Sequence, residues 1–415
     1  MDLKFTLKQY CKMFAQNCVL PFYYTLCRQA KMEKRLVIFA DAHHNSRPGN
    51  MDSLYEYLTE KDGSGKQDED GRNGTRPGGG HTMAGRKNDR FRIMELYLDY
   101  QNASFGAVMR HMLRFMKYYA RAEYVVICDN FLPVASCKKR PETKVIQLWH
   151  ACGAYKKFGY DTEDDIPKNY HGNVFRNIDL VTVSAECCVK PFASAMRLPA
   201  ERVRPLGVCR TDVYFQKDWQ EACRRDFYQA YPQAKGKKIA LWAPTFRGKA
   251  GEPELLDLDL KRLQASLGEE WLVLTRVHPH MMKKYGKDNC SIVTERLFPV
   301  TDVLIADYSS LIFEYLLFGK PLVLYVPDLK HYEEQRGFYL KIEEIPGQRI
   351  EREEELPQAI EEAYVLWQKD RKLQDGDREG SEKKRLSIFM ERYMSGCDGH
   401  ATERVAAYME GEGKK

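Results

Sequence analysis

Runs of apolar residues alternate along the chain with stretches in which apolar and polar residues recur at helical spacing. In the first half, these runs predict buried strands at Arg35–Asp41, Tyr124–Cys128, Lys144–Trp149 and Asp179–Val183. In the second half, they predict strands at Lys238–Ala243, Trp271–Thr275, Ser291–Thr294, Asp302–Ala306 and Pro321–Val326. Most of these runs are continuous, which is typical of parallel strands covered on both faces.

The segments between the predicted strands favour helices, among them Met51–Thr59 and Ser104–Arg121. The tail from Glu351 to about Glu410 predicts two helices, the last of which could cross back onto the first domain. Strands that alternate with helices in this way indicate an α/β protein. The economical architecture is a pair of doubly wound, Rossmann-like domains.

These patterns divide the chain into four expected parts: an N-terminal helical segment (1–30), a first domain (31–205), a second domain (206–385) and a C-terminal helix (386–415). The helical segment could contact a membrane surface or pack on the protein's own core. Within the first domain, residues 61–90 contain 8 glycines and only 2 apolar residues, which predicts a flexible insertion.

Composition narrows the class of protein. The length of 415 residues suits two domains of roughly 150–200 residues. The chain is 43% hydrophobic and 30% charged, as in globular proteins, and its 12% aromatic content excludes a disordered chain. A membrane-spanning protein is not expected, because the apolar stretch Cys18–Leu26 is short and contains Pro21. The 12 cysteines form no C-x-x-C pair and no secretory signal is visible, so a cytoplasmic protein with buried thiols is expected.

The net charge of +6 is mild, but basic residues gather in clusters such as Lys138–Arg140 and Lys156-Lys157. Each cluster alone is typical of a solvated face. Together they indicate an anionic partner, either a phosphate-rich substrate or a membrane surface. Nucleic acid is not an expected partner, because no zinc-finger, helix-turn-helix or basic-zipper pattern accompanies them.

Polar residues that could carry chemistry follow several predicted strands, where ligands bind in open α/β sheets. His150 follows one strand and is placed for proton transfer, although a packed histidine is the alternative. Thr245 and Arg247 follow another, where the arginine could clamp a phosphate or lie on the surface. Arg276 and His278 follow a third, and their spacing lets both side chains face one side.

Two further segments are candidates for anion binding. Asp307, Tyr308, Ser309 and Ser310 precede an apolar helix whose N-terminus could hold phosphate, and Glu314 in that helix could reach a ribose. Ordinary helix capping is the alternative. The second segment lies at the domain junction, where either ligand contacts or a plain linker would fit, and its candidate residues are Gly207, Arg210 and Asp212.

The order and spacing of these segments resemble the CDP-glycerol glycerophosphotransferase family, the teichoic-acid primases and polymerases. The resemblance covers about residues 30 to 350 and is carried by WHACGAYKKFG, RPLGVCRTDVYF, LWAPTFRG, RVHP and TDVLIADYSSLIFEYLLFGKPLVLYV. It implies a GT-B fold with the active site between an N-terminal acceptor domain and a C-terminal CDP-donor domain.

The resemblance also implies roles for single residues. It makes His150 the catalytic base and His278 a second essential histidine. It places Asp307–Ser310 at the helix that receives the donor phosphates. Its G-x-x-R-x-D segment falls on Gly207, Arg210 and Asp212. The stretch Ala151–Tyr155 departs from the usual small-residue, proline-containing pattern, which bears on the identity of the acceptor.

The implied reaction transfers glycerol phosphate, or a related polyol phosphate, from a CDP-activated donor to a hydroxyl of a lipid-linked anionic acceptor, with release of CMP. The enzyme would act on the inner face of the cell membrane without a cofactor. Asp257 and Asp259 form a D-x-D pattern, but they fit the start of a solvent-facing helix better than a metal site. A GT-B glycosyltransferase that uses a nucleotide sugar and a non-catalytic membrane-associated scaffold are the alternatives.

Overall fold

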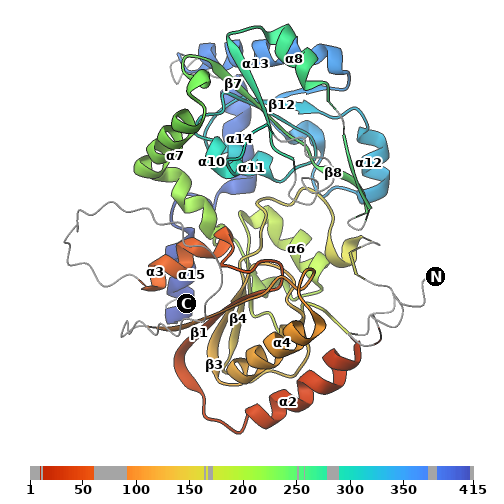
Figure 1. The fold of residues 1–415 in the computed structure, drawn as a ribbon, viewed down its shortest axis with the longest axis vertical. Coiled ribbons are helices and arrows are strands. Elements are labelled where there is room, and N and C mark those ends of the chain that lie inside the picture. Colours follow the sequence, from red (N-terminus) through yellow and green to blue (C-terminus); the bar gives the residue numbers. More distant parts are fainter. Residues whose placement is uncertain are drawn as a thin grey trace, which may run out of the picture. The chain divides into compact units, whose positions relative to one another are not determined.

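Two β-sheets, whose recorded strand pairings are all parallel, organise the chain (Figure 1). The computed structural model describes residues 10, 13–59, 91–162, 165–166, 172–249, 252–256, 258–277, 289–372 and 381–411. The chain forms two compact units: one comprises residues 1–149, 174–181 and 402–415, and the other comprises residues 150–173 and 182–401. The predicted α/β class with two parallel sheets is confirmed.

The first sheet has the strand order β2-β1-β3-β4-β5-β6. Its strands are β1 (Glu33–Asp41), β2 (Arg92–Tyr97), β3 (Ala122–Ile127), β4 (Lys144–Gln147), β5 (Leu180–Thr182) and β6 (Val203–Arg204). Six consecutive residues of β1, Leu36 to Asp41, are buried, which fits a central strand covered on both faces. The register pairs Val37 with Ile93 of β2 and with Tyr124 of β3.

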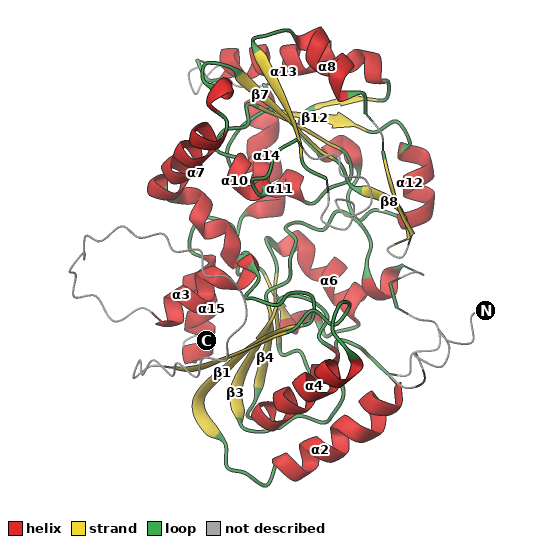
Figure 2. Cartoon of the chain, viewed as in Figure 1, coloured by secondary structure: helices red, strands yellow, loops and turns green. Residues whose placement is uncertain are grey.

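Helices cover both faces of this sheet (Figures 1 and 2). The α-helices that the structure describes in this unit are α2 (Leu20–Cys27), α3 (Asp52–Thr59), α4 (Phe105–Tyr119), α5 (Leu132–Ala135) and α15 (Ala401–Glu410). Ser104 caps α4 by accepting a hydrogen bond from Ala107 N–H. Helix α2 packs against α4 through the rings of Tyr24 and Tyr119, 5.4 Å apart. Tyr124 of β3 donates a hydrogen bond to the carbonyl of Met409, which confirms that the last helix returns to the first unit.

The second sheet has the order β10-β7-β11-β12-β13. Its strands are β7 (Lys238–Ala243), β10 (Trp271–Thr275), β11 (Val303–Ala306), β12 (Leu322–Tyr325) and β13 (Gln348–Ile350). A separate antiparallel pair is formed by β8 (Phe246–Lys249) and β9 (Glu252–Leu255). Counted along the chain, both sheets contain the order 2-1-3-4-5, which is a doubly wound arrangement.

Alternate residues of the second sheet enter two separate cores, because successive side chains point to opposite faces of a strand. Leu241 and Leu304 belong to one core, and Trp242 and Ile305 belong to the other. The first core is closed by helices that include α7 (Lys217–Ala230), α10 (Thr294–Leu297), α11 (Leu311–Leu316) and α14 (Glu382–Met394). The second core is closed by α8 (Leu260–Leu267) and α13 (Leu356–Asp370). Among the described residues, the other α-helices are α6 (Val189–Met196) and α12 (Leu329–Arg336).

Two expectations about secondary structure are wrong. Ser291–Thr294 does not form a strand in either described sheet, and Val293, which is 51% exposed, is the N-cap residue of α10. Among the residues that the structure describes, the tail beyond Glu351 has three α-helices, α13, α14 and α15, rather than two. The chain turns between α14 and α15 at Gly396, where a Cβ would touch backbone atoms.

Several expectations lie outside the described residues, among them the insertion at 61–90 and the side chains of Asp257 and His278. Within the parts of the chain that the structure describes, no helix has the length and apolar character needed to cross a membrane.

Candidate functional site

The carboxyl ends of β7 and β11 meet at one edge of the second sheet. The two strands are paired in parallel with Ala243 opposite Ala306, so the residues that follow them are neighbours. The strand order reverses here, because the chain leaves β7 for β10 on one side and reaches β11 on the other. Open α/β sheets bind ligands at such switch points. The predicted site residues Thr245 and Asp307 lie at this position.

Asp307 is fully buried and joins the two strand-end loops. Its carboxylate accepts hydrogen bonds from Thr245 N–H at 2.9 and 3.1 Å and from Tyr308 N–H at 2.6 Å. The Thr245 hydroxyl is also buried and has no hydrogen-bond partner among the described residues. A buried hydroxyl without a partner is uncommon, and a bound ligand or water can satisfy it.

Arg247 is held by two carboxylates. Its Nη1 donates to Asp307 at 2.7 Å, and its Nε and Nη2 donate to the two oxygens of Asp328 at 2.6 and 3.0 Å. Burial alone would lower the pKa of Arg247, but both carboxylates raise it above the ordinary value, so the guanidinium stays charged. Burial likewise opposes ionisation of Asp328, yet its bonds with Arg247 hold its pKa below the ordinary value. The phosphate contact predicted for Arg247 remains a prediction.

Aromatic rings support this ion network. Tyr308 stacks on Tyr332 with 4.0 Å between ring centroids, and its hydroxyl donates to Asp328 at 3.0 Å. The Arg247 guanidinium lies 4.8 Å from the Tyr308 ring centroid and 5.1 Å from that of Tyr332. Cation–π attraction is strongest where water is excluded, so the two stacked rings also help to hold the Arg247 guanidinium in place.

Lys156 adds a cation whose charge is sensitive to pH. The backbone around it pairs with the segment after α12, where Lys157 N–H donates to Gly337 and Tyr339 N–H donates to Tyr155. Burial lowers the pKa of Lys156 to about 8; the charge of Asp307 opposes the shift, and Arg336 and Arg247 add to it. A lysine of this kind can bind phosphate at neutral pH and lose its charge in mild alkali.

Ser309 and Ser310 are half-buried and lie between β11 and α11. The Ser309 hydroxyl accepts from Leu311 N–H at 3.3 Å, and Ser310 is the N-cap residue without a side-chain capping bond. Their position at the strand end matches the sequence prediction. The contact of these hydroxyls with donor phosphates remains a prediction.

Glu314 lies on the interior of α11. Its side chain has no exposed surface; one carboxylate oxygen accepts from Arg210 and the other from Tyr214 hydroxyl at 2.6 Å. Two predicted site residues, Arg210 and Glu314, are therefore brought together, but as a buried ion pair. The ribose contact predicted for Glu314 would require this pair to open.

Gly207 and Asp212 attach the segment that leads into α15. Asp212 accepts a hydrogen bond from Ala401 N–H at 3.1 Å, at the first residue of that helix. Gly207 has φ +90°, and a Cβ placed on it would lie 1.9 Å from the carbonyl oxygen of Gly396. The G-x-x-R-x-D segment thus makes internal contacts at each of its three named positions.

Replacing Gly207 with alanine is expected to lower the free energy of unfolding by more than the roughly 1–2 kcal/mol that a left-handed backbone costs an L-residue. The added Cβ would also collide with the Gly396 backbone, which cannot swing away as a side chain does. Gly236→Ala is the matched control, since Gly236 has φ +79° and open space at its Cβ. Denaturant unfolding of both variants measures the difference; equal losses would contradict the steric explanation.

His150 is exposed and belongs to the same compact unit as Asp307. It follows Trp149, whose φ of 58° turns the chain sharply after β4. Further along the loop, Gly153 donates its N–H to the Ser184 hydroxyl at 2.9 Å, and a Cβ on Gly153 would lie 2.4 Å from the Phe313 ring. The loop that carries His150 is therefore closely packed at Gly153, three residues further on.

Arg276 follows β10, next to β7 in the sheet. Its N–H donates to the carbonyl of Trp242, and its Nη1 donates to the carbonyl of Cys290 at 2.8 Å. Its partner in the sequence motif, His278, is outside the described residues. The phosphate-binding role predicted for the two residues stays a prediction.

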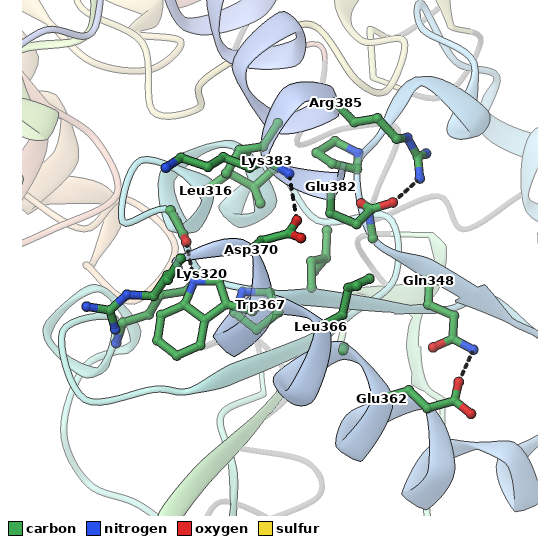
Figure 3. A pocket seen from close by; sticks show the side chains of 18 residues that line it. Leu316, Lys320, Gln348, Glu362, Leu366, Trp367, Asp370, Glu382, Lys383 and Arg385 are labelled. Atoms are coloured by element: carbon green, nitrogen blue, oxygen red, sulfur yellow. Dashed lines mark hydrogen bonds and ion pairs between the residues drawn. The ribbon is translucent and has the colours of Figure 1, made fainter. Parts of the chain in front are cut away.

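A pocket of about 530 Å³ lies elsewhere on the second unit, between α13 and α14 (Figure 3). It is lined by residues that precede β12 and β13, such as Lys320 and Gly347, so it opens at the amino ends of these strands. Two of its polar side chains already have partners: Trp367 Nε1 donates to the Gly319 carbonyl at 2.7 Å, and Asp370 accepts from Lys383 N–H at 3.2 Å. Ligand sites of open α/β sheets lie at the opposite edge.

Three residues of the switch-point network were not selected from the sequence: Asp328, Tyr332 and Lys156. Lys156 carried a signal as part of a basic pair six residues after His150. Tyr332 lies in the polar helix α12, and Asp328 is the N-cap residue of that helix, so neither residue stands out in the sequence. Their contacts with Arg247 depend on the tertiary fold, because they are about 80 residues away in the chain.

Comparison with known proteins agrees with this architecture. The family model described as CDP-glycerol:poly(glycerophosphate) glycerophosphotransferase matches residues 22–411. The teichoic acid ribitol-phosphate primase of Bacillus spizizenii is 33% identical over 321 residues, which are 73% of this chain and 79% of the primase. The teichoic acid poly(ribitol-phosphate) polymerase of the same species is 31% identical over 310 residues, 70% of this chain, but this chain spans only 47% of the polymerase.

Among solved structures, the wall teichoic acid polymerase TagF superposes with a TM-score of 0.69 and 17% identity, covering 99% of this chain and 98% of the TagF chain. Two doubly wound units with this likeness define a GT-B type fold. The protein is thus of the transferase class that the sequence predicted. The chain belongs to the CDP-glycerol:poly(glycerophosphate) glycerophosphotransferase family.

Proposed function

We propose that the chain transfers glycerol phosphate or ribitol phosphate from a CDP-activated donor to a hydroxyl of a lipid-linked, anionic acceptor in teichoic-acid-like polymer synthesis, with release of CMP. The family match over residues 22–411 carries the proposal. The family description names glycerophosphate and the relatives' names specify ribitol phosphate, so both donors are included. The proposed reaction uses no bound metal or cofactor.

In the proposed step, the acceptor oxygen forms a bond to the phosphorus that carries the polyol, and the bond from that phosphorus to the oxygen of CMP breaks. His150 accepts the proton of the attacking hydroxyl. A well-placed general base of this kind accelerates a reaction roughly 10²–10⁴-fold. Phosphoryl transfer depends chiefly on positioning and on neutralising the phosphate oxygens. Lys156, Arg276 and His278 are the proposed cations for that purpose.

The switch point of the second sheet is the proposed donor site. Ser309, Ser310 and the buried Thr245 hydroxyl would donate to the donor phosphates, and Asp307 would keep the two loops together. Arg247 would act through this network rather than as the main phosphate ligand, because two carboxylates already hold it. Hydrogen-bond donors that are already in position lower the activation barrier of phosphate transfer, because they need not reorient during the reaction.

CMP release is the direct test of the proposed function. Purified protein would be supplied with CDP-glycerol or CDP-ribitol and a membrane-extract acceptor. Release with either donor that depends on the acceptor supports the proposal and names the polyol. Turnover of a nucleotide sugar with neither CDP-polyol used would favour the glycosyltransferase alternative, and nucleotide binding without turnover of any donor would favour the scaffold.

Donor use is expected to fall in mild alkali because Lys156 loses its proton near pH 8. A lysine is charged below its pKa, so the alkaline limb of kcat/KM for the donor should begin near pH 8 and fall about tenfold per unit well above it. Lys156→Gln should lower kcat/KM at pH 7 and remove this alkaline decline. Lys157→Gln is the control and should keep the alkaline decline. If Lys156→Gln also kept the alkaline decline, the role of Lys156 would be contradicted.

A membrane contact is the second part of the proposal. Phe14, Cys18, Phe22 and Leu26 are exposed and spaced four residues apart on the helical segment that ends with α2. Four exposed basic residues follow this stripe, at Arg28, Lys31, Lys34 and Arg35. An apolar stripe beside basic residues fits the interface of an anionic membrane, which attracts each nearby cation by about 1 kcal/mol.

Replacing Phe14 and Phe22 together with serine is expected to reduce binding to vesicles at least tenfold, because two large apolar side chains leave the interface. Flotation with phosphatidylglycerol vesicles and with neutral phosphatidylcholine vesicles measures the effect. Ile388→Ser is the control, since Ile388 is 54% exposed on α14, in the other compact unit. If the double variant floated with vesicles as the wild type does, the apolar stripe would not be part of the membrane contact.

A further inference from the structure

The first sheet has a switch point like that of the second. Strands β1 and β3 are neighbours, with β2 on the far side of β1 and β4 beyond β3. Ligand sites in open α/β sheets form beyond the carboxyl ends of such strands. Here β1 ends at Asp41, which is followed by His43 and His44, and β3 is followed by Cys128 and Asp129.

Asp41 is 2% exposed and fixes the turn after β1. One of its carboxylate oxygens accepts from His43 N–H at 2.7 Å, from His44 N–H at 2.8 Å and from His44 Nδ1 at 2.9 Å. The other oxygen accepts a weak bond from Cys128 Sγ at 3.8 Å. The two backbone bonds alone would suffice for a capped turn, so the bond to the imidazole is an additional feature.

This bond determines which nitrogen of His44 is available. A carboxylate only accepts hydrogen bonds, so Nδ1 of His44 is protonated and donates its N–H to Asp41. In the neutral ring, Nε2 is then a hydrogen-bond acceptor. The His44 side chain is 56% exposed while its Asp41 partner is 2% exposed, so the oriented ring reaches solvent at the strand end.

The charges around His44 favour a neutral ligand group over an anion. Asp129 lies 4.0 Å from the His43 ring, and Asp41 contacts His44 directly. The nearby cation Arg47 is already paired, with Asp52 at 2.5 Å and Glu95 at 2.9 Å. Phosphate would meet these carboxylates, whereas a hydroxyl can donate to His44 Nε2 and accept from other groups. Among the described residues, no group of three or more histidines, cysteines and acids is arranged to hold a metal ion.

We propose that His44, oriented by Asp41, binds a hydroxyl at the polyol or sugar end of the acceptor. The site lies in the first unit and is distinct from the residues proposed above for the donor. The inference rests on the proposed function, because it assigns the acceptor of that reaction to this strand end. His44 is a binding residue and Asp41 is a positioning residue.

Steady-state kinetics with His44→Ala separate acceptor binding from donor binding. Loss of one uncharged hydrogen bond is expected to raise the KM for the acceptor roughly three- to tenfold, with the donor KM unchanged. His331→Ala is the matched control, an exposed histidine on α12 whose ring bonds Gln335. An unchanged acceptor KM, or an equal rise of both KM values, would overturn the proposal.

Direct binding tests the site without turnover, so its result is independent of the proposed reaction. The full chain labelled with ¹⁵N-histidine would be titrated with oligo(glycerol phosphate), oligo(ribitol phosphate) and inorganic phosphate. The His44 ring signals, assigned by their loss in His44→Ala, should shift with at least one oligomer and not with inorganic phosphate. An equal shift with inorganic phosphate, or no shift with any probe, would overturn the hydroxyl site.

Asp41→Asn tests the positioning role by spectroscopy. The ¹⁵N shifts of His44 should show the Nδ1–H tautomer in the wild type and a mixture in Asp41→Asn, because an amide can also donate to the ring. The acceptor KM should rise about as much as in His44→Ala. A changed tautomer with an unchanged acceptor KM would show that the Asp41–His44 bond serves only the turn.

Discussion

Replacing His150 with alanine is expected to lower kcat for polyol-phosphate transfer roughly 10²–10⁴-fold, which is the usual contribution of a general base. His150 is exposed on its loop, so its removal creates no cavity and should leave the fold intact. CMP release measures kcat, and calorimetric titration with CDP measures nucleotide affinity, which should stay within about twofold because a base that acts on the acceptor contributes little to donor binding.

His331→Ala is the control for His150→Ala as well, and it should retain full activity. A variant that lost CDP affinity in parallel with kcat would indicate that His150 contacts the nucleotide instead. Retention of more than half of the wild-type kcat would contradict its assignment as the base.

Replacing Glu314 with alanine is expected to destabilise the protein by about 3–5 kcal/mol, because removal of one partner leaves a buried charge uncompensated. Glu314 has no exposed surface, and Arg210 is only 15% exposed. The hydroxyl of Tyr214 would lose its acceptor as well. Denaturant unfolding followed by tryptophan fluorescence measures the loss.

A triple variant, Arg210→Met with Tyr214→Phe and Glu314→Leu, is the control for this prediction. It removes the three polar partners together, and well-packed apolar replacements of a buried ion pair are often neutral or stabilising. The donor KM, measured at a temperature where Glu314→Ala is folded, should be unchanged. Unaltered stability with a donor KM raised tenfold would instead support the ribose contact predicted from the sequence.

Four strands of the second sheet, β7, β10, β11 and β12, could be predicted from the sequence because they are short, continuous apolar runs that are almost entirely buried. The edge strand β13 was not predicted, because two of its three residues are exposed and polar. Lys238–Ala243 and Trp271–Thr275 are found with the predicted bounds. Ser291–Thr294 contains only two apolar residues, Ser291 N–H bonds to the Tyr231 hydroxyl, and Val293 is the N-cap residue of α10. A run of four residues contains too little information to decide whether a sheet neighbour exists.

The position of the candidate site could also be predicted, since Thr245 and Asp307 follow neighbouring strands. The hydrogen-bond partners of the site residues could not be predicted from the sequence. The carboxylates that hold Arg247 come from Asp307 and Asp328, and this choice depends on distances across the fold. Glu314 was expected to face a ligand, but α11 is buried from Ile312 to Leu316 and therefore has no solvent-facing polar side there.

The first unit is built from both ends of the chain, and this has a consequence for synthesis on the ribosome. Helix α15 supplies Val405, Ala406 and Met409 to the buried interior and receives the hydrogen bond from Tyr124. At about 5–20 residues per second, residue 401 follows β1 by tens of seconds. The second unit, which ends at residue 401, has all its strands and helices before α15 emerges. The first unit, whose strands are made first, is therefore the last to complete its fold. Until α15 is made, the apolar surface that this helix covers is exposed, and chaperones would bind the nascent protein during that time.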